Sequence, residues 1–250
     1  MIFLSPSNRN DVKKLLKETK LLMLDFDGTL VEFEKTEKKA LNAFLKKNNV
    51  RANKRKKAIK FYDQINKQLW RKFEKKELTL EEVRKSRFLA LKEKYALRGD
   101  PEKLDKEYLQ YLIECTKTTK QTLKLLGKLK EKYKVYVITN GIHYVQLARL
   151  EKTRIMNLTD GFVTSEKIGA PKPESDMFNY ILEKENMKPK QAFVVGDSYK
   201  ADILGANKLG IKSCLIVKSK TKRKKFDEKE KPNMIAKSFV EWAKFIISIN

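Results

Sequence analysis

The chain has 250 residues, and hydrophobic residues make up 41% of them, which is enough to build a buried core and excludes a wholly disordered protein. Charged residues make up 36%, and the net charge of +25 raises nucleic acid and acidic membrane surfaces as partners, because a basic field attracts phosphate. No apolar stretch approaches the roughly 20 residues that a membrane span needs, so we expect no membrane-spanning segment.

The N-terminal part of the chain predicts a helix, a buried strand and a long helical block. Residues 11–19 have the spacing of a short amphipathic helix, and 21–26 form an apolar run that ends in acid and glycine, as a buried parallel strand does. From about 32 to 117 the apolar residues recur at helical spacing. This segment is therefore predicted to be all-helical.

Two capping signals mark helix starts inside that block. Thr79 with Glu82 has the spacing of a capping box, and Asp100 before Pro101 combines an N-cap residue with proline at the first helical position. We expect helices to begin near residues 80 and 101.

Helices and strands alternate in the rest of the chain. The predicted helices are about 121–132, from about 144, about 174–185, 201–209 and 239–249, and the predicted strands are 134–139, 161–164, 192–195, 213–217 and 234–236. Such alternation predicts a doubly wound parallel sheet, whose ligand site lies at the carboxyl ends of its strands. The charged segment 218–231 is predicted to be a solvated loop.

The first strand ends in Asp25-Phe26-Asp27-Gly28-Thr29. A match to four fixed residues in a chain of this length has a probability on the order of 10⁻³. A turn at Gly28 aims both carboxylates at one centre, where they repel each other unless a cation is present. Mg²⁺ accepts one or two carboxylates together with phosphate oxygens. The motif therefore predicts an Mg²⁺–phosphate site.

Two later strand ends add phosphate-binding groups. Thr139-Asn140-Gly141 offers a hydroxyl and turn amides that hold phosphate oxygens. Lys172 lies between two prolines, which fix the backbone around its ammonium group.

A further strand end adds two acids. Asp197 follows the strand 192–195, and Asp202 comes five residues later. Taken alone, these acids could simply cap the helix that follows. In the company of the other three motifs, they predict a metal site.

Taken together and in this order, the four motifs resemble those of the haloacid dehalogenase superfamily. The resemblance spans about residues 21–217. It implies an α/β fold with a Rossmann-like doubly wound core, residues 1–31 and 118–250, and an inserted α-helical cap of the C1 type at 32–117. It also implies a hydrolase that depends on Mg²⁺.

The resemblance also implies a role for each motif residue. Asp25 resembles the nucleophile that forms an aspartyl phosphate, and Asp27 the general acid and base. The implied phosphate-binding residues are Thr139, Asn140 and Lys172; the implied Mg²⁺ ligands are Asp25, Asp27 and Asp197, with Asp202 as a supporting acid. Dehalogenases lack the second acid, so Asp27 favours phosphatase chemistry.

The segments 139–150 and 165–169 look most like the branch that contains pyrimidine 5′-nucleotidases and N-acylneuraminate-9-phosphatases. This implies a small phosphorylated metabolite, such as a nucleoside 5′-monophosphate, as substrate. A sugar-phosphate phosphatase or a phosphomutase of the same fold is the alternative.

Several other residues have both a functional and an ordinary interpretation. Trp70, Phe73, Arg84 and Arg87 lie in the predicted cap and are candidates for selecting the substrate, although for Trp70, Arg84 and Arg87 a core or solvated role is the simpler reading. His143 follows the Thr139 motif and could touch the substrate, but a surface position at a helix start is the simpler expectation.

Lysines occur along the whole chain, for example in 54–57, 128–134 and 218–225, rather than in one stripe interleaved with aromatic residues. No nucleic-acid-binding motif accompanies them. We therefore attribute the charge to a general lysine bias and do not expect a nucleic-acid partner. A basic noncatalytic module that binds RNA or a protein is the alternative from another functional class.

Two further observations concern the location of the protein and its two cysteines. Residues 1–10 lack the basic-then-apolar order of a secretory signal, so a cytoplasmic location is expected. Cys115 and Cys214 lie far apart without the spacing of a metal site, and both are predicted to be buried as small hydrophobic side chains.

Overall fold

The computed structural model describes residues 2–3, 8–218, 227 and 230–249. The chain divides into two compact units, Met1–Glu32 with Thr118–Asn250, here called the core unit, and Phe33–Lys117, here called the helical unit. The predicted loop 218–231 lies mostly outside the described residues.

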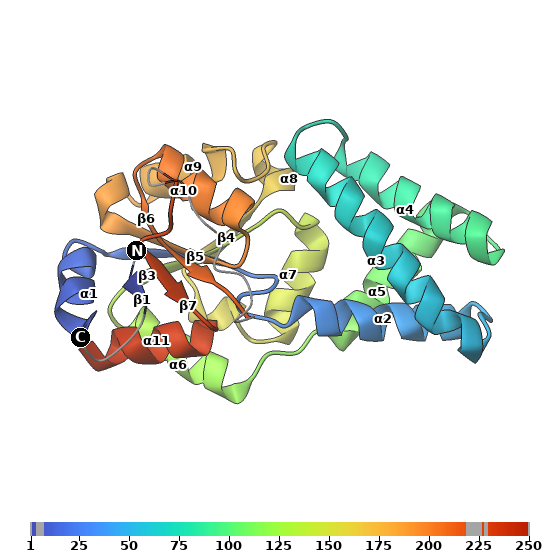
Figure 1. Cartoon of the computed structure of the whole chain (residues 1–250), viewed down its shortest axis with the longest axis horizontal. Helices are drawn as coiled ribbons and strands as arrows, with labels where there is room; N and C mark the ends of the chain where they lie inside the picture. The colour runs from blue at the N-terminus through green and yellow to red at the C-terminus, as the bar shows by residue number, and fades with distance from the viewer. Residues whose placement is uncertain (1, 4–7, 219–226, 228–229, 250) are drawn as a thin grey trace. The chain divides into compact units, whose positions relative to one another are not determined.

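A seven-stranded parallel sheet forms the centre of the core unit (Figure 1). Its strands are β1 (Ile2–Phe3), β2 (Leu21–Asp25), β3 (Lys134–Thr139), β4 (Gly161–Thr164), β5 (Ala192–Gly196), β6 (Lys212–Ile216) and β7 (Met234–Ala236). The order across the sheet is β1-β7-β6-β5-β2-β3-β4. The chain thus runs outward from β2 through β3 to β4, then crosses to β5 on the other side of β2. In such sheets ligands bind where the order reverses, which here is between β2 and β5.

Helices cover both faces of this sheet. They are α1 (Arg9–Leu16), α6 (Lys120–Lys130), α7 (His143–Lys152), α8 (Ser165–Ile168), α9 (Asp176–Lys184), α10 (Leu204–Lys208) and α11 (Phe239–Ile249), with 3₁₀ turns η2 (Met156–Leu158) and η3 (Pro189–Gln191) and the π-helical turn η4 (Tyr199–Ile203). Figure 1 shows α6 and α11 along one side of the sheet and α9 and α10 along the other. The prediction of an α/β doubly wound fold is confirmed.

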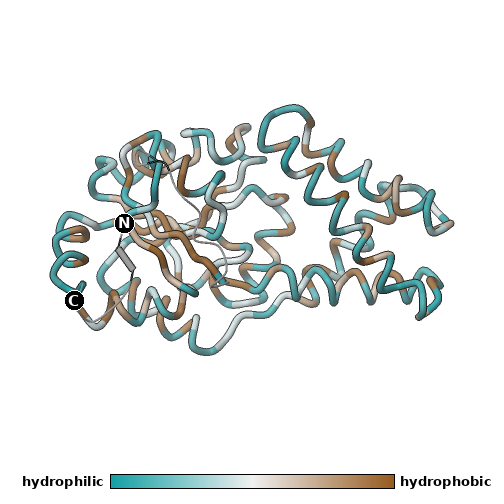
Figure 2. Tube along the Cα trace, in the orientation of Figure 1, coloured by the Kyte–Doolittle hydropathy of each residue, from teal (hydrophilic) through white to brown (hydrophobic). Residues whose placement is uncertain are grey.

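The alternation of side chains along β2 explains these layers. Leu22 and Leu24 pack in one cluster with α1, α6 and α11, whereas Leu21 and Met23 pack in a second cluster with α9 and α10. Because both faces are covered, the strands are apolar throughout, and Figure 2 shows this as brown segments in the sheet.

The helical unit consists of α2 (Phe33–Lys47), α3 (Ala52–Glu74), α4 (Leu80–Tyr95) and α5 (Pro101–Cys115). Its centre is aromatic: the rings of Phe44, Tyr62, Phe88 and Tyr108 contact one another, with ring centroids 5.4 to 6.2 Å apart. No strand lies among its residues, all of which are described.

Both predicted capping signals are confirmed. Thr79 accepts a hydrogen bond from the amide of Glu82 in a complete capping box, and Asp100 accepts one from the amide of Glu102 at the start of α5.

Several local predictions differ from the structure. The first helix ends at Leu16 rather than at 19, and the strand after it ends at Asp25 rather than at 26. The two-residue strand β1 and the four-residue helix α8 were not predicted, because neither is long enough to show a periodic pattern. Cys214 is buried as predicted, whereas Cys115, at the end of α5, is only partly buried.

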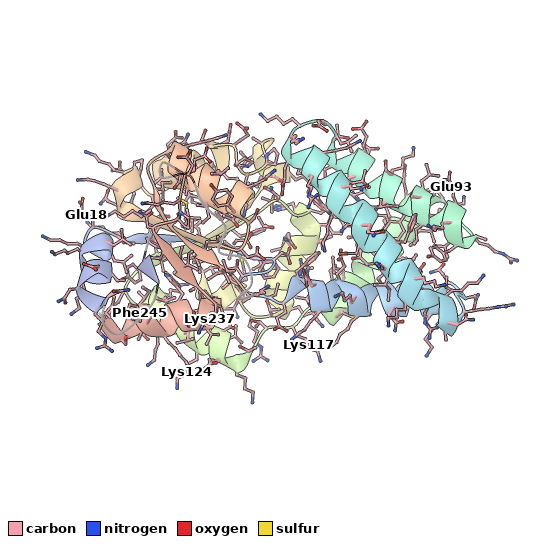
Figure 3. All side chains as sticks on the ribbon, in the orientation of Figure 1. Glu18, Glu93, Lys117, Lys124, Lys237 and Phe245 are labelled. Atoms are coloured by element: carbon pink, nitrogen blue, oxygen red, sulfur yellow. The ribbon has the colours of Figure 1, made fainter. Side chains whose placement is uncertain are left out.

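Basic side chains project from both units in Figure 3, where Lys117, Lys124 and Lys237 are labelled. The Lys237 side chain is 73% exposed. This spread matches a general lysine bias rather than a single basic stripe. In the described part of the chain, no helix combines the length and apolarity that a membrane crossing requires.

Candidate active site

The register of the sheet brings the predicted motifs to one edge. Asp25, the last residue of β2, pairs with Ile138 of β3, so Thr139 is the next residue along that strand. On the other side, Leu24 pairs with Val195 of β5, and Asp197 follows at the end of that strand. The site is therefore built at the point where the strand order reverses.

Lys172 lies buried at the centre of this edge, with 2% of its side chain exposed. Its Nζ donates to Asp25 Oδ1 (2.9 Å), to Asp202 Oδ1 (2.6 Å) and to the carbonyl of Ile138 (3.1 Å). Burial alone would lower the pKa of Lys172, but the Asp202 and Asp25 carboxylates hold it above its usual value. The three protons of the ammonium group are thus all in use. Binding of phosphate by Lys172 stays a prediction, and it requires exchange of one of these contacts.

Asn140 fixes the backbone of that lysine. Its Oδ1 accepts from the Lys172 amide (2.8 Å), and its Nδ2 donates to the Lys172 carbonyl (3.0 Å). Both ends of the Asn140 side chain are therefore occupied. These contacts position Lys172, and phosphate binding at Asn140, which the turn amides could provide, stays a prediction.

Three carboxylates gather beside the lysine. Oxygens of Asp25, Asp197 and Asp202 all lie within 4.8 Å of one another. Asp202 is fully buried, and its Oδ2 accepts from the Ser198 amide at 3.0 Å. Within the described residues, the buried Oδ2 of Asp25 has no hydrogen-bond partner.

The cluster carries more negative charge than its buried lysine offsets. Burial raises the pKa of Asp25 well above its usual value, with a contribution from Asp202 and Asp197 that Lys172 partly opposes. Burial and the Asp202 carboxylate raise the pKa of Asp197 to about 7. An unpartnered buried oxygen within a group of hard oxygen ligands fits a small divalent cation such as Mg²⁺. Asp25 and Asp197 are the residues whose oxygens could hold it.

Gly28 allows Asp197 to reach this position. Its φ of +97° is favoured only by glycine, and a Cβ atom there would lie 1.9 Å from Asp197 Oδ2. The glycine of the first motif thus accommodates the acid of the fourth.

Asp27 contacts a different set of residues. Arg149 donates from NH2 to Asp27 Oδ1 (2.6 Å) and from NH1 to Oδ2 (2.9 Å), and Gln146 Nε2 also donates to Oδ2 (2.8 Å). The structure does not bring the Asp27 carboxylate into the three-acid cluster. The Asp27 carboxylate is engaged by α7, whereas Asp202, predicted as a supporting acid, lies among the clustered acids. A role for Asp27 in holding the metal stays a prediction.

Gln146 and Arg149 were not identified from the sequence as site residues. The one available signal was a glutamine and an arginine three positions apart on an otherwise apolar helix face. Such a pair has many ordinary explanations, and its partner lies more than a hundred positions away in sequence.

The Thr139 hydroxyl is oriented by two donors. Its Oγ1 accepts from the Gly141 amide (3.1 Å) and from Gln146 Nε2 (2.7 Å). A hydroxyl has two acceptor positions and one proton, so this arrangement leaves the proton free to be donated outward. The arrangement suits a phosphate oxygen as acceptor.

The capping interpretation of the fourth motif does not hold for Asp197. Ser198 is the N-cap of η4, and its Oγ accepts from the Ala201 amide at 3.1 Å. Asp197 therefore has no such local role in the described structure.

The candidate residues of the helical unit are engaged within that unit. Arg87 is 4% exposed and donates to Asp105 and Asn66, and Arg84 also donates to Asp105. Their suggested role in selecting a substrate is therefore not supported. Phe73 is buried, and partly buried Trp70 packs edge-on against it at 5.5 Å.

His143 is partly buried at the start of α7, rather than fully on the surface. Its ring stacks on Phe162 with centroids 5.0 Å apart, and its Nδ1 lies 3.0 Å from Thr164 Oγ1. These contacts give His143 a structural role.

Comparison with known proteins agrees with this geometry. The family model described as haloacid dehalogenase-like hydrolase matches residues 22–216, which include all four motifs. The chain belongs to this family. The predicted membership in the haloacid dehalogenase (HAD) superfamily, and with it the prediction of a HAD-like phosphatase, is confirmed at the level of the family.

The chain is similar to several named members of the family. The chain is 30% identical to the HAD-hydrolase YfnB of Bacillus subtilis (strain 168) over 80% of this chain and 84% of the relative. It is also 30% identical to the pyrimidine 5′-nucleotidase PynA of Streptococcus pneumoniae (strain ATCC BAA-255 / R6), over 77% of this chain and 81% of the relative. A crystal structure of YfnB bound to magnesium superimposes with a TM-score of 0.78 at 26% identity, covering 92% of this chain and 98% of YfnB.

Proposed function

We propose that the chain is a Mg²⁺-dependent phosphomonoester hydrolase that works through an aspartyl phosphate on Asp25. The observation that carries this proposal is the buried Asp25 Oδ2, which has no hydrogen-bond partner among the described residues and lies in a cluster with surplus negative charge. An oxygen in this state is available to an external partner, either a metal ion or a phosphorus atom.

The first half-reaction transfers the phosphoryl group to the enzyme. An Asp25 oxygen forms a bond to phosphorus while the bond to the leaving oxygen breaks, and Asp27 gives that oxygen a proton. The Thr139 hydroxyl donates to a non-reacting phosphoryl oxygen. When bound by Asp25 and Asp197, Mg²⁺ offsets negative charge on the carboxylates and the phosphoryl group.

The second half-reaction returns Asp25 to its initial state. Asp27, now deprotonated, takes a proton from a water molecule whose oxygen bonds to phosphorus, and the bond between Asp25 and phosphorus breaks. The products are inorganic phosphate and the free carboxylate. Lys172 stabilises Asp25 in this step, because its ammonium lies 2.9 Å from Asp25 Oδ1.

We propose a small phosphorylated metabolite as substrate, with a nucleoside 5′-monophosphate as the first candidate. Two relatives support this choice: PynA and the Escherichia coli (strain K12) protein YjjG, both named pyrimidine 5′-nucleotidases, each 30% identical to this chain. A sugar-phosphate phosphatase is the second candidate. It is favoured by a glyceraldehyde 3-phosphate phosphatase of Methanothermobacter thermautotrophicus that is 35% identical over 44% of this chain.

We also propose that the helical unit, 33–117, acts as a cap that selects the substrate. Its support is its insertion directly after the first motif and its separate aromatic core. Trp70→Ala should then change the ranking of natural substrates more than the turnover of p-nitrophenyl phosphate.

A phosphate-release screen tests the proposed reaction. The wild-type protein is assayed on p-nitrophenyl phosphate, nucleoside monophosphates, sugar phosphates and a phosphopeptide, each with Mg²⁺ and with EDTA at one ionic strength. We expect Mg²⁺-dependent release that EDTA abolishes, with a small metabolite as the best substrate. Activity that EDTA leaves unchanged would contradict the metal requirement, and a phosphopeptide as best substrate would contradict the substrate class.

A further inference from the structure

The acid and base of the proposed reaction, Asp27, is held by two residues of α7. Arg149 makes two parallel hydrogen bonds to its carboxylate, of 2.6 and 2.9 Å, and Gln146 adds a third of 2.8 Å. Two parallel bonds from a guanidinium fix the plane of a carboxylate as well as its position. Asp27 lies on the turn after β2, so these contacts restrain a side chain that the sheet itself does not hold.

The pair is itself rigidly built. Gln146 and Arg149 are each 1% exposed, and Gln146 Oε1 accepts from Arg149 NH1 at 2.6 Å. The Arg149 guanidinium also lies 4.8 Å from the centroid of the Phe26 ring. A Cβ atom on Gly141 would lie 2.4 Å from Gln146 Nε2, so the loop after β3 has a glycine where this side chain passes.

The same glutamine contacts a second reacting group. Gln146 Nε2 lies 2.8 Å from Asp27 Oδ2 and 2.7 Å from Thr139 Oγ1. One amide group therefore bridges the carboxylate proposed to transfer the proton and the hydroxyl proposed to donate to the phosphoryl group. Proton transfer to the leaving oxygen depends on such distances at the level of about an ångström.

We propose that Gln146 and Arg149 are positioning residues that hold Asp27 in line with the leaving oxygen. This inference rests on the proposed function and adds two residues to it. In this proposal both residues act through Asp27, and Gln146 also acts through Thr139.

The test uses two substrates that differ in their need for a proton. Phenyl phosphate releases a strongly basic oxygen that requires protonation, whereas p-nitrophenyl phosphate releases a much weaker base. The quantity measured is kcat/KM, which reports the steps up to departure of the leaving group. General acid catalysis contributes roughly 10²- to 10⁴-fold. For Arg149→Met we expect a loss of roughly 10²-fold on phenyl phosphate and of less than about tenfold on p-nitrophenyl phosphate.

A double-mutant cycle separates positioning from a general structural role. If Arg149 acts through Asp27, adding Arg149→Met to Asp27→Asn should lower kcat/KM by less than about threefold beyond Asp27→Asn alone. The inference would be overturned if Arg149→Met lowered kcat/KM by the same factor in Asp27→Asn as in wild type. It would also be overturned if Arg149→Met caused equal losses on both substrates. If Arg149→Met does not fold, Gln146→Met, which has similar volume and no donor, replaces it in the comparison of the two substrates, where the larger loss on phenyl phosphate is again expected; it does not replace it in the cycle, because Gln146 also contacts Thr139.

Two controls complete the design. Lys152→Met removes a positive charge from an exposed position on the same helix and should leave both rates within about twofold. If wild type itself shows no Mg²⁺-dependent hydrolysis of either ester, the proposed function fails and the inference falls with it. If wild type is active but the two substrates respond alike to Arg149→Met, only the inference fails.

Discussion

Two buried groups of charged side chains, one in each unit, differ in how their charges are balanced. In the helical unit, the Asp105 carboxylate accepts from Arg84 at 2.8 Å and from Arg87 at 3.1 and 2.6 Å, so both its oxygens face cations. In the core unit, three carboxylates gather around the buried ammonium of Lys172, and one oxygen of Asp25 has no partner in the described structure.

This difference separates a structural cluster from a functional one. A buried charge is tolerated when opposite charges and hydrogen bonds compensate for its lost hydration, as they do around Asp105. Surplus buried negative charge costs free energy unless a cation arrives. Ionisable groups in such unfavourable surroundings are found most often at functional sites. We therefore interpret the core-unit cluster, which has an unpartnered carboxylate oxygen in the described structure, as the candidate site, and the cluster around Asp105, whose two oxygens both face cations, as part of the fold.

The largest expected effect is on activity at the unbalanced cluster. Asp25→Asn should lower kcat by roughly 10³-fold or more, because the nucleophile is lost. The metal-free variant should be no less stable than metal-free wild type, because a carboxylate whose ionisation burial opposes has been removed. Phosphate release and urea unfolding measure the two effects. Activity within tenfold of wild type would remove Asp25 from the mechanism.

In the helical unit, a substitution in the buried cluster around Asp105 should lower stability. Arg87→Met leaves Asp105 with one arginine fewer in a buried site and should lower the free energy of unfolding by about 3 kcal/mol or more. The matched control is Lys85→Met, at an exposed position on the same helix, which should change it by less than about 0.5 kcal/mol. Urea unfolding measures both. An effect of Arg87→Met as small as that of its control would refute the structural assignment.

Raised pKa values at the core-unit cluster predict how pH affects stability. Since the folded state raises the pKa of Asp197 to about 7 and that of Asp25 well above its usual value, it binds these protons more tightly than the unfolded chain does. As pH rises through 7 the protons leave, and the metal-free protein loses stability. Mg²⁺ competes with them, so its stabilising effect should be larger at pH 8 than at pH 5.5.

Thermal unfolding with and without Mg²⁺ at the two pH values measures this competition. At a Mg²⁺ concentration of 100 times the dissociation constant, the stabilisation at pH 8 should approach about 2.7 kcal/mol. In Asp197→Asn, the stabilisation by Mg²⁺ should differ less between pH 5.5 and pH 8 than it does in wild type. An Mg²⁺ effect that is equal at both pH values in wild type would argue against Asp25 and Asp197 as the ligands.

The smallest effect is expected at the margin of the cluster. Lys218 Nζ lies 4.0 Å from Asp197 Oδ2, and the two side chains are 52% and 34% exposed. Exposed pairs contribute little, so Lys218→Met should tighten Mg²⁺ binding by less than about threefold. Calorimetric titration measures this change. A change of tenfold or more would show that Lys218 is one of the charges that determine the Mg²⁺ affinity of the site.

The sequence predicted the parts of the site that are encoded locally. Asp25, Thr139, Lys172 and Asp197 each lie at or just after the end of an apolar run or between prolines, and parallel strands bring such ends to one edge of a sheet. The alternation of helices and strands predicted the doubly wound core for the same reason.

The rest depends on contacts between distant residues. The Asn140 side chain binds the backbone of Lys172, 32 positions away, and the sequence gives no signal of this contact. The contact between the Asp27 carboxylate and Arg149, 122 positions away, has no signal in the sequence. For Arg87 a core or solvated role was the simpler reading, and its buried contact with Asp105, 18 positions away, agrees with a core role but could not be read from the sequence. Neither composition nor periodicity carries information on such pairs.

The central claim, that Asp25 carries the phosphoryl group, is tested most directly by trapping the intermediate. Asp27→Asn should slow loss of the phosphoryl group from Asp25 more than its arrival from p-nitrophenyl phosphate, whose leaving group needs little protonation. Acid quenching during turnover, followed by peptide mass spectrometry, should find one phosphoryl group, labile to hydroxylamine, on the peptide that contains Asp25. Turnover with no phosphoryl group on that peptide, or with the group on another residue, would contradict the claim.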